Sequence, residues 1–546
     1  MGAIAPPGAT TSASEMLVER LLDPPAPGNA LYTYEGGEYR PHTWSECGDL
    51  ARRAATHLRE AGAEPGDVVA CVFDNTLASA VLPLAAWLVG SRVASLPPRP
   101  RGVTREQHVD KLVEICADCD AKVVAAPTPF DEDLRAAPDL TAHALSLDRL
   151  TSAALPFDSS AVEALDSGLF IQYSSGSTGD PRGCVLAAEG IVAQLDMLVD
   201  RVGLTTDDRF VSWIPLSHDM GLFGGLLASW WSGMTVWLGT TTRFLLSAGT
   251  WLNDCAQVGA TLTVSPNFGV ALAARSAQRR LPPALSLRKW IVASDYISNH
   301  TLRSAVESLG PAGIREETFM PGYGLAEATL CVTMVESGIA PPVAPVPGDP
   351  GQVAVSSGTP LPGNSVRIDG DEEIGEIVVR SPSLALGYLG RPDVARERFR
   401  DGELWTRDLG FVRDGHLYVV GRLDDRLSVA GRTVHTKQVE AALEAEQEIR
   451  GNSCVLTEAT VGGVRRVVLL AEPRRSAGDS RSLAATLGKA TYERIGVRVD
   501  DCLLLRPGAL PMTASGKKQR VLACRLAERL LAGEGTDEGH SVVHLT

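Results

Sequence analysis

The sequence predicts an α/β protein with a large N-terminal domain and a small C-terminal α+β domain. Its 546 residues exceed what one hydrophobic core normally supports, which predicts at least two domains. In the first 335 residues, helical patterns alternate with short apolar runs, the order that builds parallel sheets covered by helices. A stretch rich in Pro, Gly, Val and Ser at 338–365 then interrupts this order. We therefore expect two α/β layered subdomains and a β-rich subdomain in the large domain.

The first α/β subdomain is predicted over residues 15–150. Helical patterns at 16–22 and 44–61 alternate there with apolar runs at 68–73 and 122–126. This alternation implies a layer of parallel strands with helices packed on it.

The second α/β subdomain is predicted over residues 167–335, where the same alternation returns. A helix is expected to begin near residue 187, and the strands are expected at 169–173, 210–214, 261–264 and 290–292. Two apolar stretches, 77–91 and 221–239, are too short or too interrupted by Pro, Gly and Ser to span a membrane, and we expect both in the core.

The rest of the chain is predicted to contain the β-rich subdomain and a separate terminal unit. Residues 338–365 are expected to form loops, followed by strands near 366–368, 376–380 and 417–420. After about residue 424 the predicted elements are a helix at 436–447, strands near 453–457 and 466–471, and a helix at 481–494. Residues 533–546 are expected to be a frayed tail.

Composition limits the classes of function. The net charge of −15 argues against a nucleic-acid partner and against docking on an anionic membrane. The ten cysteines form no disulfide framework, and the pair Cys116 and Cys119 is best interpreted as two unrelated helix cysteines rather than a zinc or redox motif. This cysteine usage, and an N-terminus without the cationic region of a signal peptide, predict a cytoplasmic protein without an integral membrane segment.

A loop rich in Gly, Ser and Thr follows the predicted strand at 169–173. The run from Tyr173 to Gly183 reads Tyr-Ser-Ser-Gly-Ser-Thr-Gly-Asp-Pro-Arg-Gly. Such glycines let backbone N–H groups approach an anion, and the hydroxyls add donors, so the run indicates a phosphate-binding loop. The spacing excludes a Walker loop, a dinucleotide fingerprint and a hydrolase G-x-S-x-G elbow.

Five further segments carry unusual local chemistry. Each one alone is more economically interpreted as an ordinary turn, surface ion pair or solvated loop. They are Trp213-Ile-Pro-Leu-Ser-His-Asp-Met-Gly221, with His218 and Asp219 expected in an exposed turn, Phe319-Met-Pro-Gly-Tyr-Gly-Leu-Ala-Glu-Ala-Thr329, Leu404-Trp-Thr-Arg-Asp-Leu-Gly410, Gly421-Arg-Leu-Asp-Asp-Arg-Leu427 and Pro511-Met-Thr-Ala-Ser-Gly-Lys517.

In order and spacing, these five segments and the phosphate loop resemble the core motifs of the adenylate-forming superfamily. This superfamily contains acyl-CoA synthetases, peptide-synthetase adenylation domains and luciferases. The resemblance spans about residues 30–525, and six motifs in the same order are not produced by chance. The segments most similar to fatty acyl-AMP ligases are Phe170-Ile-Gln-Tyr-Ser-Ser-Gly-Ser-Thr-Gly, Trp213-Ile-Pro-Leu-Ser-His-Asp-Met-Gly, Ser265-Pro-Asn-Phe and Tyr323-Gly-Leu-Ala-Glu-Ala-Thr.

The resemblance implies ATP and Mg²⁺ as cofactors. A carboxylate attacks the α-phosphorus of ATP, and the charge on the phosphoryl oxygens must be met by cations and oriented donors. Glu327 would bind the magnesium ion, Tyr323 would lie against the adenine, and Asp408 with Arg422 would bind the ribose. The remaining nucleotide contacts implied are Ser174, Ser177, Thr178, Gly179, Arg182, Ser294, Asp295, Gly324 and Thr329.

The resemblance also implies two domains that move. The large domain would cover residues 1–423, and the small mobile domain, 424–546, would rotate about a hinge at Asp424. It would bring Lys517 to the reacting carboxylate and α-phosphate for adenylation, and then open a path for a thiol of coenzyme A or of phosphopantetheine on an acyl carrier protein. His218 would gate carboxylate access to a hydrophobic pocket walled by residues 220–238, and the small Ser217 hints at room for a bulky acyl group.

Four departures from the family pattern affect this interpretation. Arg182 replaces the usual lysine of the phosphate loop, and Arg407 replaces the glycine before Asp408. The segment 292–296 lacks the Gly-Ala-Glu-Pro pattern, which weakens the assignment of Ser294 and Asp295 as nucleotide contacts. The connection after Thr329 is short for a fatty acyl-AMP ligase, whose insertion is associated with weak use of coenzyme A, so both acceptors stay open.

The leading interpretation is an acid–thiol ligase that adenylates a hydrophobic carboxylic acid and passes the acyl group to a thiol. An Ala-, Arg- and Gly-rich chain would suit a natural-product pathway. One alternative is an enzyme that only transfers a supplied acyl-AMP to a thiol. Another is a catalytically silent acyl or nucleotide sensor.

Overall fold

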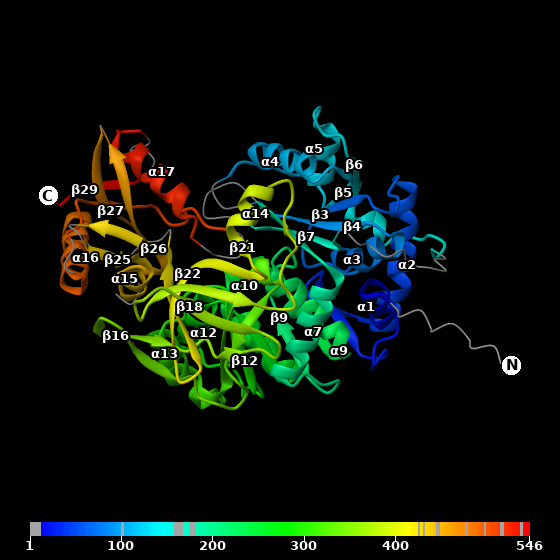
Figure 1. Cartoon of the computed structure of the whole chain (residues 1–546), viewed down its shortest axis with the longest axis horizontal. Helices are drawn as coiled ribbons and strands as arrows, with labels where there is room; N and C mark the ends of the chain where they lie inside the picture. Colours follow the sequence, from blue (N-terminus) through cyan, green and yellow to red (C-terminus); the bar gives the residue numbers. More distant parts are fainter. Residues whose placement is uncertain are drawn as a thin grey trace.

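The computed structural model places two α/β subdomains, a β-rich subdomain and a terminal unit along the chain. In Figure 1 the N-terminal half occupies one side of the molecule, and the orange and red C-terminal unit occupies the other. The structure describes residues 12–99, 103–157, 168–174, 182–423, 426–429, 432–443, 448–461, 463–474, 479–495, 498–513, 518–534 and 539–545.

The first α/β subdomain is built on a seven-stranded sheet with the order β20-β8-β7-β4-β3-β5-β6. Its core strands are parallel, as the alternation predicted, and β8 and β20 add antiparallel pairs at one edge. The strands are β3 Val68–Val72, β4 Arg92–Leu96, β5 Ala121–Ala126, β6 His143–Ser146, β7 Phe170–Ser174, β8 Arg182–Leu186 and β20 Gly387–Tyr388. The accompanying helices are α1 Ala13–Leu22, α2 Trp44–Glu60, α3 Leu77–Val89, α4 Arg105–Asp118, α5 Phe130–Ala136 and α6 Leu147–Leu150.

The second α/β subdomain is built on a nine-stranded sheet with the order β17-β14-β13-β12-β11-β9-β10-β1-β2. Strands β10, β9, β11, β12 and β13 pair in parallel, so their carboxyl ends share one edge. The strands are β1 Ala30–Glu35, β2 Glu38–Thr43, β9 Arg209–Ser212, β10 Thr235–Leu238, β11 Leu262–Ser265, β12 Lys289–Val292, β13 Phe319–Gly324, β14 Cys331–Met334 and β17 Thr359–Pro360. The helices are α7 Ala188–Val202, α8 Asp219–Gly221, the π-helix η1 Leu222–Leu227, α9 Ala228–Ser232, α10 Thr241–Leu246, α11 Ala248–Val258, α12 Asn267–Arg279, α13 Asn299–Leu309, and the 3₁₀ helices η2 Gly310–Ala312, η3 Glu316–Thr318 and η4 Ala326–Ala328.

The β-rich subdomain contains a five-stranded antiparallel sheet and a separate hairpin. Strands β18, β19, β22 and β21 follow one another in the sheet, and β23 pairs with β22. Its elements are β15 Val343–Val346, β16 Asp349–Val355, β18 Ser365–Asp369, β19 Gly375–Arg380, α14 Pro392–Arg398, β21 Phe399–Arg400, β22 Glu403–Arg413 and β23 His416–Arg422. The expectation of loops throughout 338–365 is wrong, because β15, β16 and β17 lie there.

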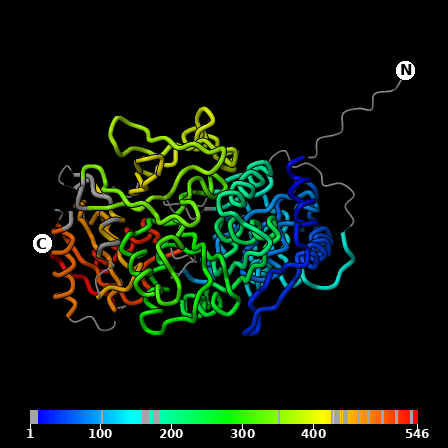
Figure 2. Tube along the Cα trace, turned by 90° about the horizontal axis from the view of Figure 1, so that it is seen from below, coloured from blue at the N-terminus to red at the C-terminus, as the bar shows by residue number. Residues whose placement is uncertain are grey.

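The C-terminal unit is an α+β structure with its own cores. A four-stranded sheet, β26-β27-β28-β29, buries apolar side chains on both faces. Its elements are β24 Arg426–Val429, β25 Arg432–His435, α15 Thr436–Leu443, β26 Ile449–Val461, β27 Val464–Pro473, α16 Ser480–Ile495, β28 Asp501–Leu504, α17 Arg520–Leu531 and β29 Ser541–His544. Figure 2 shows this unit beside the green second subdomain and away from the blue first one.

Two sequence expectations about apolar segments and the chain end can now be assessed. The run 77–91 forms the buried helix α3, and most of 221–239 forms the buried helices η1 and α9. Among the described residues, no helix is long and apolar enough to cross a membrane. The frayed tail predicted for 533–546 is wrong in part, because Cys502 of β28 pairs with Val543 of β29.

Candidate nucleotide and acyl site

One cavity of about 1730 Å³ connects the two α/β subdomains, the β-rich subdomain and the C-terminal unit. Its polar part is lined by residues on or just after β12, β13, β22 and β23, and the last three of these strands carry three of the predicted motifs. Its apolar part extends beneath η1, where the lining residues include Leu198, Val202, Leu204, Phe210, Gly224, Ala228, Leu262, Leu330 and Met334. The arrangement offers one polar compartment and one apolar compartment in a single cavity.

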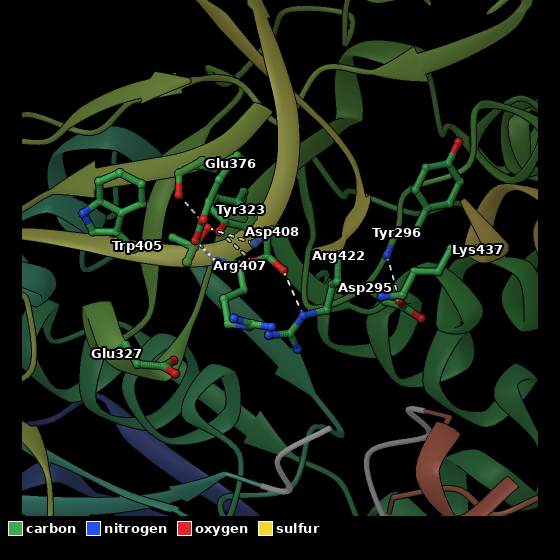
Figure 3. Close-up of polar contacts among 12 residues, drawn as sticks. Asp295, Tyr296, Tyr323, Glu327, Glu376, Trp405, Arg407, Asp408, Arg422 and Lys437 are labelled. Atoms are coloured by element: carbon green, nitrogen blue, oxygen red, sulfur yellow. Dashed lines mark hydrogen bonds and ion pairs between the residues drawn. The ribbon is translucent and has the colours of Figure 1, made fainter. Parts of the chain in front are cut away.

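The polar compartment is organised around Asp408. The Tyr323 hydroxyl donates a hydrogen bond of 2.7 Å to Asp408 Oδ2, and Arg422 Nε lies 3.1 Å from Oδ1 (Figure 3). Burial, and then the neighbouring Asp408 charge, raise the pKa of Tyr323, so its hydroxyl keeps its proton and remains a donor. The predicted adenine and ribose contacts are therefore brought together in one cluster, joined by a hydrogen bond and an ion pair.

Arg407 lies next to this cluster in an unusual backbone conformation. Its φ is +60°, a region that glycine tolerates best, and glycine is the residue that Arg407 replaces in the family pattern. The Arg407 N–H donates to Glu376 Oε1 at 2.7 Å, which ties the turn to the neighbouring strand β19 (Figure 3). Glu376, which the sequence motifs do not include, thus fixes the backbone beside Asp408.

Glu327 lies on η4 at another wall of the cavity. Tyr388 Oη donates to Glu327 Oε1 at 2.6 Å, and Arg398 Nη2 lies 3.6 Å from the same oxygen. Neither partner belongs to a motif, and both come from sequence 61 to 71 residues farther along the chain. Within the described part of the chain, no group of three or more His, Cys, Asp or Glu side chains could hold a metal ion.

The predicted phosphate loop falls mainly outside the described residues, including Ser177, Thr178 and Gly179. The structure does show its two flanks: Ser174 ends β7 and pairs in register with Arg182, which begins β8. The Arg182 guanidinium lies 6.0 Å from the centre of the Tyr388 ring and lines the cavity. Arg182 is therefore placed within the same wall as the Tyr388–Glu327 pair.

His218 and Asp219 were expected in an exposed turn, but each side chain is only 14% exposed. His218 directly precedes the short helix α8, and its Nδ1 lies near both the Met220 N–H, at 3.1 Å, and the Asp219 carboxylate. Its Nε2 lies 3.4 Å from the hydroxyl of Ser294. All three residues line the cavity between its polar and apolar compartments.

Asp295 joins the large domain to the C-terminal unit. Lys437 Nζ of α15 lies 3.2 Å from Asp295 Oδ1, and the Tyr296 N–H donates to the same oxygen at 2.8 Å (Figure 3). Burial alone would raise the pKa of Asp295, but Lys437 and Lys518 hold it below the ordinary value. A domain rotation as implied by the family would have to break the Asp295–Lys437 pair. Asp424 and Lys517 lie outside the described residues.

Gly324 and Thr329 are placed differently. Gly324 lines the cavity, and a Cβ at this position would lie 1.7 Å from the Leu330 carbonyl oxygen, so only glycine fits. The Thr329 side chain is buried and donates to the Ser383 carbonyl at 2.7 Å. Thr329 is absent from the cavity wall, and its hydroxyl connects the Glu327 turn to residues 381–383.

Gln172 is a further polar residue that the motifs did not single out. Its amide nitrogen donates to the Ser217 carbonyl at 3.2 Å, whereas its buried Oε1 has no hydrogen-bond partner among the described residues. Gln172 lies in the middle of β7 and lines the cavity, so this oxygen is available to a ligand donor. The only sequence signal that could have identified Gln172 as a site residue was its position two residues before Ser174, in the Phe-Ile-Gln-Tyr run.

Comparisons with known proteins agree with this geometry. The family model described as AMP-binding enzyme matches residues 25–389. The chain is 28% identical over 401 residues to the medium-chain-fatty-acid–[acyl-carrier-protein] ligase JamA of Moorena producens, covering 66% of this chain and 68% of that protein. It is 28% identical over 562 residues to the long-chain-fatty-acid–AMP ligase FadD26 of Mycobacterium tuberculosis, covering 90% and 94%.

Solved structures show the same architecture. A structure from a study of fatty acyl-adenylate ligases of E. coli and L. pneumophila superposes with a TM-score of 0.84 at 26% identity, over 96% of this chain and 99% of that one. The McyG A-PCP complex with phenylalanyl-adenylate reaches 0.85 at 18% identity over 97% of each chain, which supports the fold alone. The resemblance and the fold class predicted from the motifs are thus confirmed, and the chain belongs to the AMP-binding enzyme family, with acyl-AMP ligases and acyl-CoA synthetases among its relatives.

Proposed function

We propose that the chain uses ATP and Mg²⁺ to adenylate a hydrophobic carboxylic acid and then passes the acyl group to a thiol. The observation that carries this proposal is the continuous cavity, in which the Tyr323–Asp408–Arg422 cluster and Glu327 share one space with an apolar compartment. A nucleotide and an acyl chain can meet there only where the compartments join. The apolar lining favours a fatty or other bulky hydrophobic acid.

The donor set around Glu327 fits a magnesium ion that a nucleotide brings with it. Mg²⁺ usually takes one or two protein carboxylates and completes its shell with phosphate oxygens and water. Glu327 supplies one carboxylate, and Tyr388 fixes it through Oε1. Bound there, the ion would neutralise phosphate charge during pyrophosphate departure. Arg398 and Arg182 would add positive charge around the same phosphates.

Nucleotide binding would be divided among the walls of the cavity. Asp408 would accept hydrogen bonds from the ribose hydroxyls, with Arg422 as a second donor and Tyr323 holding the carboxylate in place. Ser174, Ser177, Thr178 and Gly179 would hold the β and γ phosphates.

The catalytic lysine would come from the C-terminal unit. Thr513 and Lys518, which flank the segment containing Lys517, both line the cavity. Lys518 Nζ itself lies 3.0 Å from the buried Glu440 carboxylate. Lys517 would therefore be the lysine that meets the carboxylate and the α-phosphate, because the geometry already gives Lys518 a structural partner.

The thiol acceptor is proposed as phosphopantetheine on an acyl carrier protein, with coenzyme A as the second candidate. The relative JamA is a medium-chain-fatty-acid–[acyl-carrier-protein] ligase, and this chain covers 68% of that protein. Purified holo carrier proteins and coenzyme A, offered separately to the acyl-adenylate, would distinguish the two acceptors by the thioester formed.

The first experiment is ATP–pyrophosphate exchange with Mg²⁺ across fatty, aryl and polycyclic acids, with hydroxylamine trapping of the adenylate. We expect exchange with one acid class and a loss of at least about a hundredfold in Lys517→Ala, with ATP affinity nearly unchanged, because this lysine acts in the transition state. Lys518→Ala is the matched control and should retain more exchange. Absence of exchange with every acid, despite ATP binding, would favour an enzyme that only transfers supplied acyl-AMP, or a silent sensor.

A further inference from the structure

Ser294, His218 and Asp219 form a continuous chain of contacts on the cavity wall. Asp219 contacts His218 Nδ1, and His218 Nε2 lies 3.4 Å from Ser294 Oγ. A hydroxyl, an imidazole and a carboxylate in this order are the parts of a nucleophile activated by a base that a third group orients. The contact between Ser294 and His218 is long enough to need tightening on substrate binding, as is common before substrate is bound.

The proton positions follow from the contacts of the Met220 N–H. This amide lies 2.7 Å from Asp219 Oδ1 and 3.1 Å from His218 Nδ1, and we assign its hydrogen bond to the closer, charged carboxylate. Nδ1 then carries the imidazole proton and donates it to Asp219. The lone pair of Nε2 consequently faces the Ser294 hydroxyl and can accept its proton.

The backbone holds Ser294 in an unusual conformation at this position. Ser294 follows the end of β12 with a φ of +79°, which is uncommon for a residue with a Cβ. Such strain persists only where the surroundings enforce it, and it is frequent at active sites.

The three residues lie where the apolar and polar compartments join. Met220 and Gly224 continue the cavity wall from His218 into the apolar part, and Tyr323 lies on the polar side. An acyl-adenylate that fills both compartments has its carbonyl carbon at this junction. The hydroxyl of Ser294 and the imidazole of His218 are therefore next to the bond that links the acyl group to AMP.

We propose that Ser294, His218 and Asp219 constitute a hydrolytic triad that destroys acyl-adenylate when no thiol acceptor takes it. The inference rests on acyl-adenylate formation by the same cavity. Ser294 Oγ attacks the acyl carbon and its proton passes to His218 Nε2. The bond between the acyl carbon and the phosphate oxygen then breaks, and AMP leaves with that proton on its phosphate, which restores neutral His218. Water then attacks the acyl-serine ester, giving a proton to His218. That proton returns to Ser294 as the ester bond breaks, and the free carboxylic acid leaves.

This activity would act as an editing step. An acid that is adenylated but fits the acceptor poorly stays longer beside Ser294, and it is returned to solution at the expense of one ATP. A correct acid is removed by the thiol before hydrolysis. The chain would thereby discriminate twice, once on forming the adenylate and once on consuming it.

The test compares two rates in the same full-length protein without any thiol. ATP–pyrophosphate exchange reports adenylation, and AMP accumulation reports consumption of the adenylate. We expect the ratio of AMP accumulation to exchange to fall about tenfold or more in Ser294→Ala. Ser304→Ala, at another serine of the cavity wall, is the matched control and should keep the wild-type ratio.

A second variant detects the covalent step directly. Ser294→Cys retains a nucleophile, and we expect peptide mass analysis to find the acyl group on residue 294. An unchanged ratio in Ser294→Ala, an equal fall in Ser304→Ala, or an unmodified residue 294 in the Cys variant would overturn the proposal. Absence of exchange in the wild-type protein is a different result, because it would contradict adenylation itself.

Discussion

The hydroxyl of Tyr323 donates a 2.7 Å hydrogen bond to the carboxylate of Asp408, from a strand 85 residues earlier in the chain. Tyr323 lies at the end of β13 in the second α/β sheet, whereas Asp408 lies on β22 in the β-rich subdomain. The bond therefore couples two subdomains at the proposed ribose site. A hydrogen bond to a charged acceptor is about twice as strong as one between neutral groups.

Tyr323→Phe should weaken nucleotide binding without unfolding the protein. The substitution keeps the ring but removes the donor that holds Asp408 Oδ2, leaving the carboxylate free to turn toward Arg422. We expect the KM for ATP in the exchange assay to rise about tenfold, equivalent to about 1.4 kcal/mol. Tyr418→Phe removes a hydroxyl from a ring stacked on Phe411 in the same subdomain and should leave the KM unchanged. Equal KM values for the two variants would contradict the role given to Tyr323.

Part of this site could be predicted from local patterns, because Tyr323 and Arg422 lie where strands β13 and β23 end. Asp408 lies inside β22, and Tyr323 belongs to a different sheet from Asp408 and Arg422, so their meeting depends on how two subdomains pack. The order of the motifs indicated which residues belong together, although it did not show the direct Tyr323–Asp408 bond.

Other partners had no local signal. Tyr388 reaches Glu327 because the two-residue strand β20 pairs with β8, some 200 residues earlier, and so short a strand has no detectable periodicity. The terminal strand β29 was missed for a related reason. It is stabilised by pairing with β28, which the local sequence does not reveal, and a polar tail that contains only four strand residues resembles a frayed end. His218 was wrongly expected to be exposed because it is polar. Its contact with Asp219 gives both side chains a polar partner, which permits their burial.

Glu440→Gln should destabilise the C-terminal unit strongly. The buried Glu440 carboxylate receives Arg520 through two contacts of 2.7 and 2.8 Å, Lys518 at 3.0 Å and the Leu456 N–H at 2.8 Å. Loss of the negative charge leaves two cations without their shared anion, and we expect a loss of about 3 kcal/mol in the free energy of unfolding of this unit. Urea denaturation followed by circular dichroism measures it.

The matched control is Glu493→Gln on α16, where the exposed Glu493 lies 3.6 Å from Lys489. A surface pair contributes about 1 kcal/mol or less. Similar losses in the two variants would show that Glu440 is not an anchor for the segment before α17.

Acid should destabilise the protein partly through His108. Burial, and then the nearby Arg99, lower the pKa of His108 to about 4. Above the unfolded value of about 6.5 the ring is neutral in both states, so His108 adds no pH dependence there. As the pH falls below 6.5 the unfolded chain takes up the proton first, so the free energy of unfolding falls until about pH 4, by roughly 2 kcal/mol at pH 4.5.

His108→Gln removes this titration, so the free energy of unfolding should change less between pH 6.5 and 4.5 than it does in the wild type. Thermal or urea unfolding at several pH values in this window measures the slope. His143→Gln, at an exposed histidine of β6, should keep the wild-type slope. A wild-type slope in His108→Gln would mean that other groups account for the acid sensitivity.

Gly224→Val should shorten the acids that the chain accepts. Gly224 lines the apolar compartment on η1, and a Cβ there would lie 3.0 Å from Leu330 Cδ2, so a larger side chain must push Leu330 aside or project into the cavity. Either response removes volume from the apolar compartment, which penalises long acyl chains more than short ones. We expect the exchange rate with a long fatty acid to fall at least about tenfold relative to a short one.

The control is Gly225→Ala. A Cβ at Gly225 would meet Met220 and Phe210 at an ordinary 3.6 Å, and Gly225 lies outside the cavity wall. The ratio of the long-acid rate to the short-acid rate should therefore stay at the wild-type value. An unchanged long-to-short ratio in Gly224→Val would mean that the acyl chain follows another path from the junction at His218.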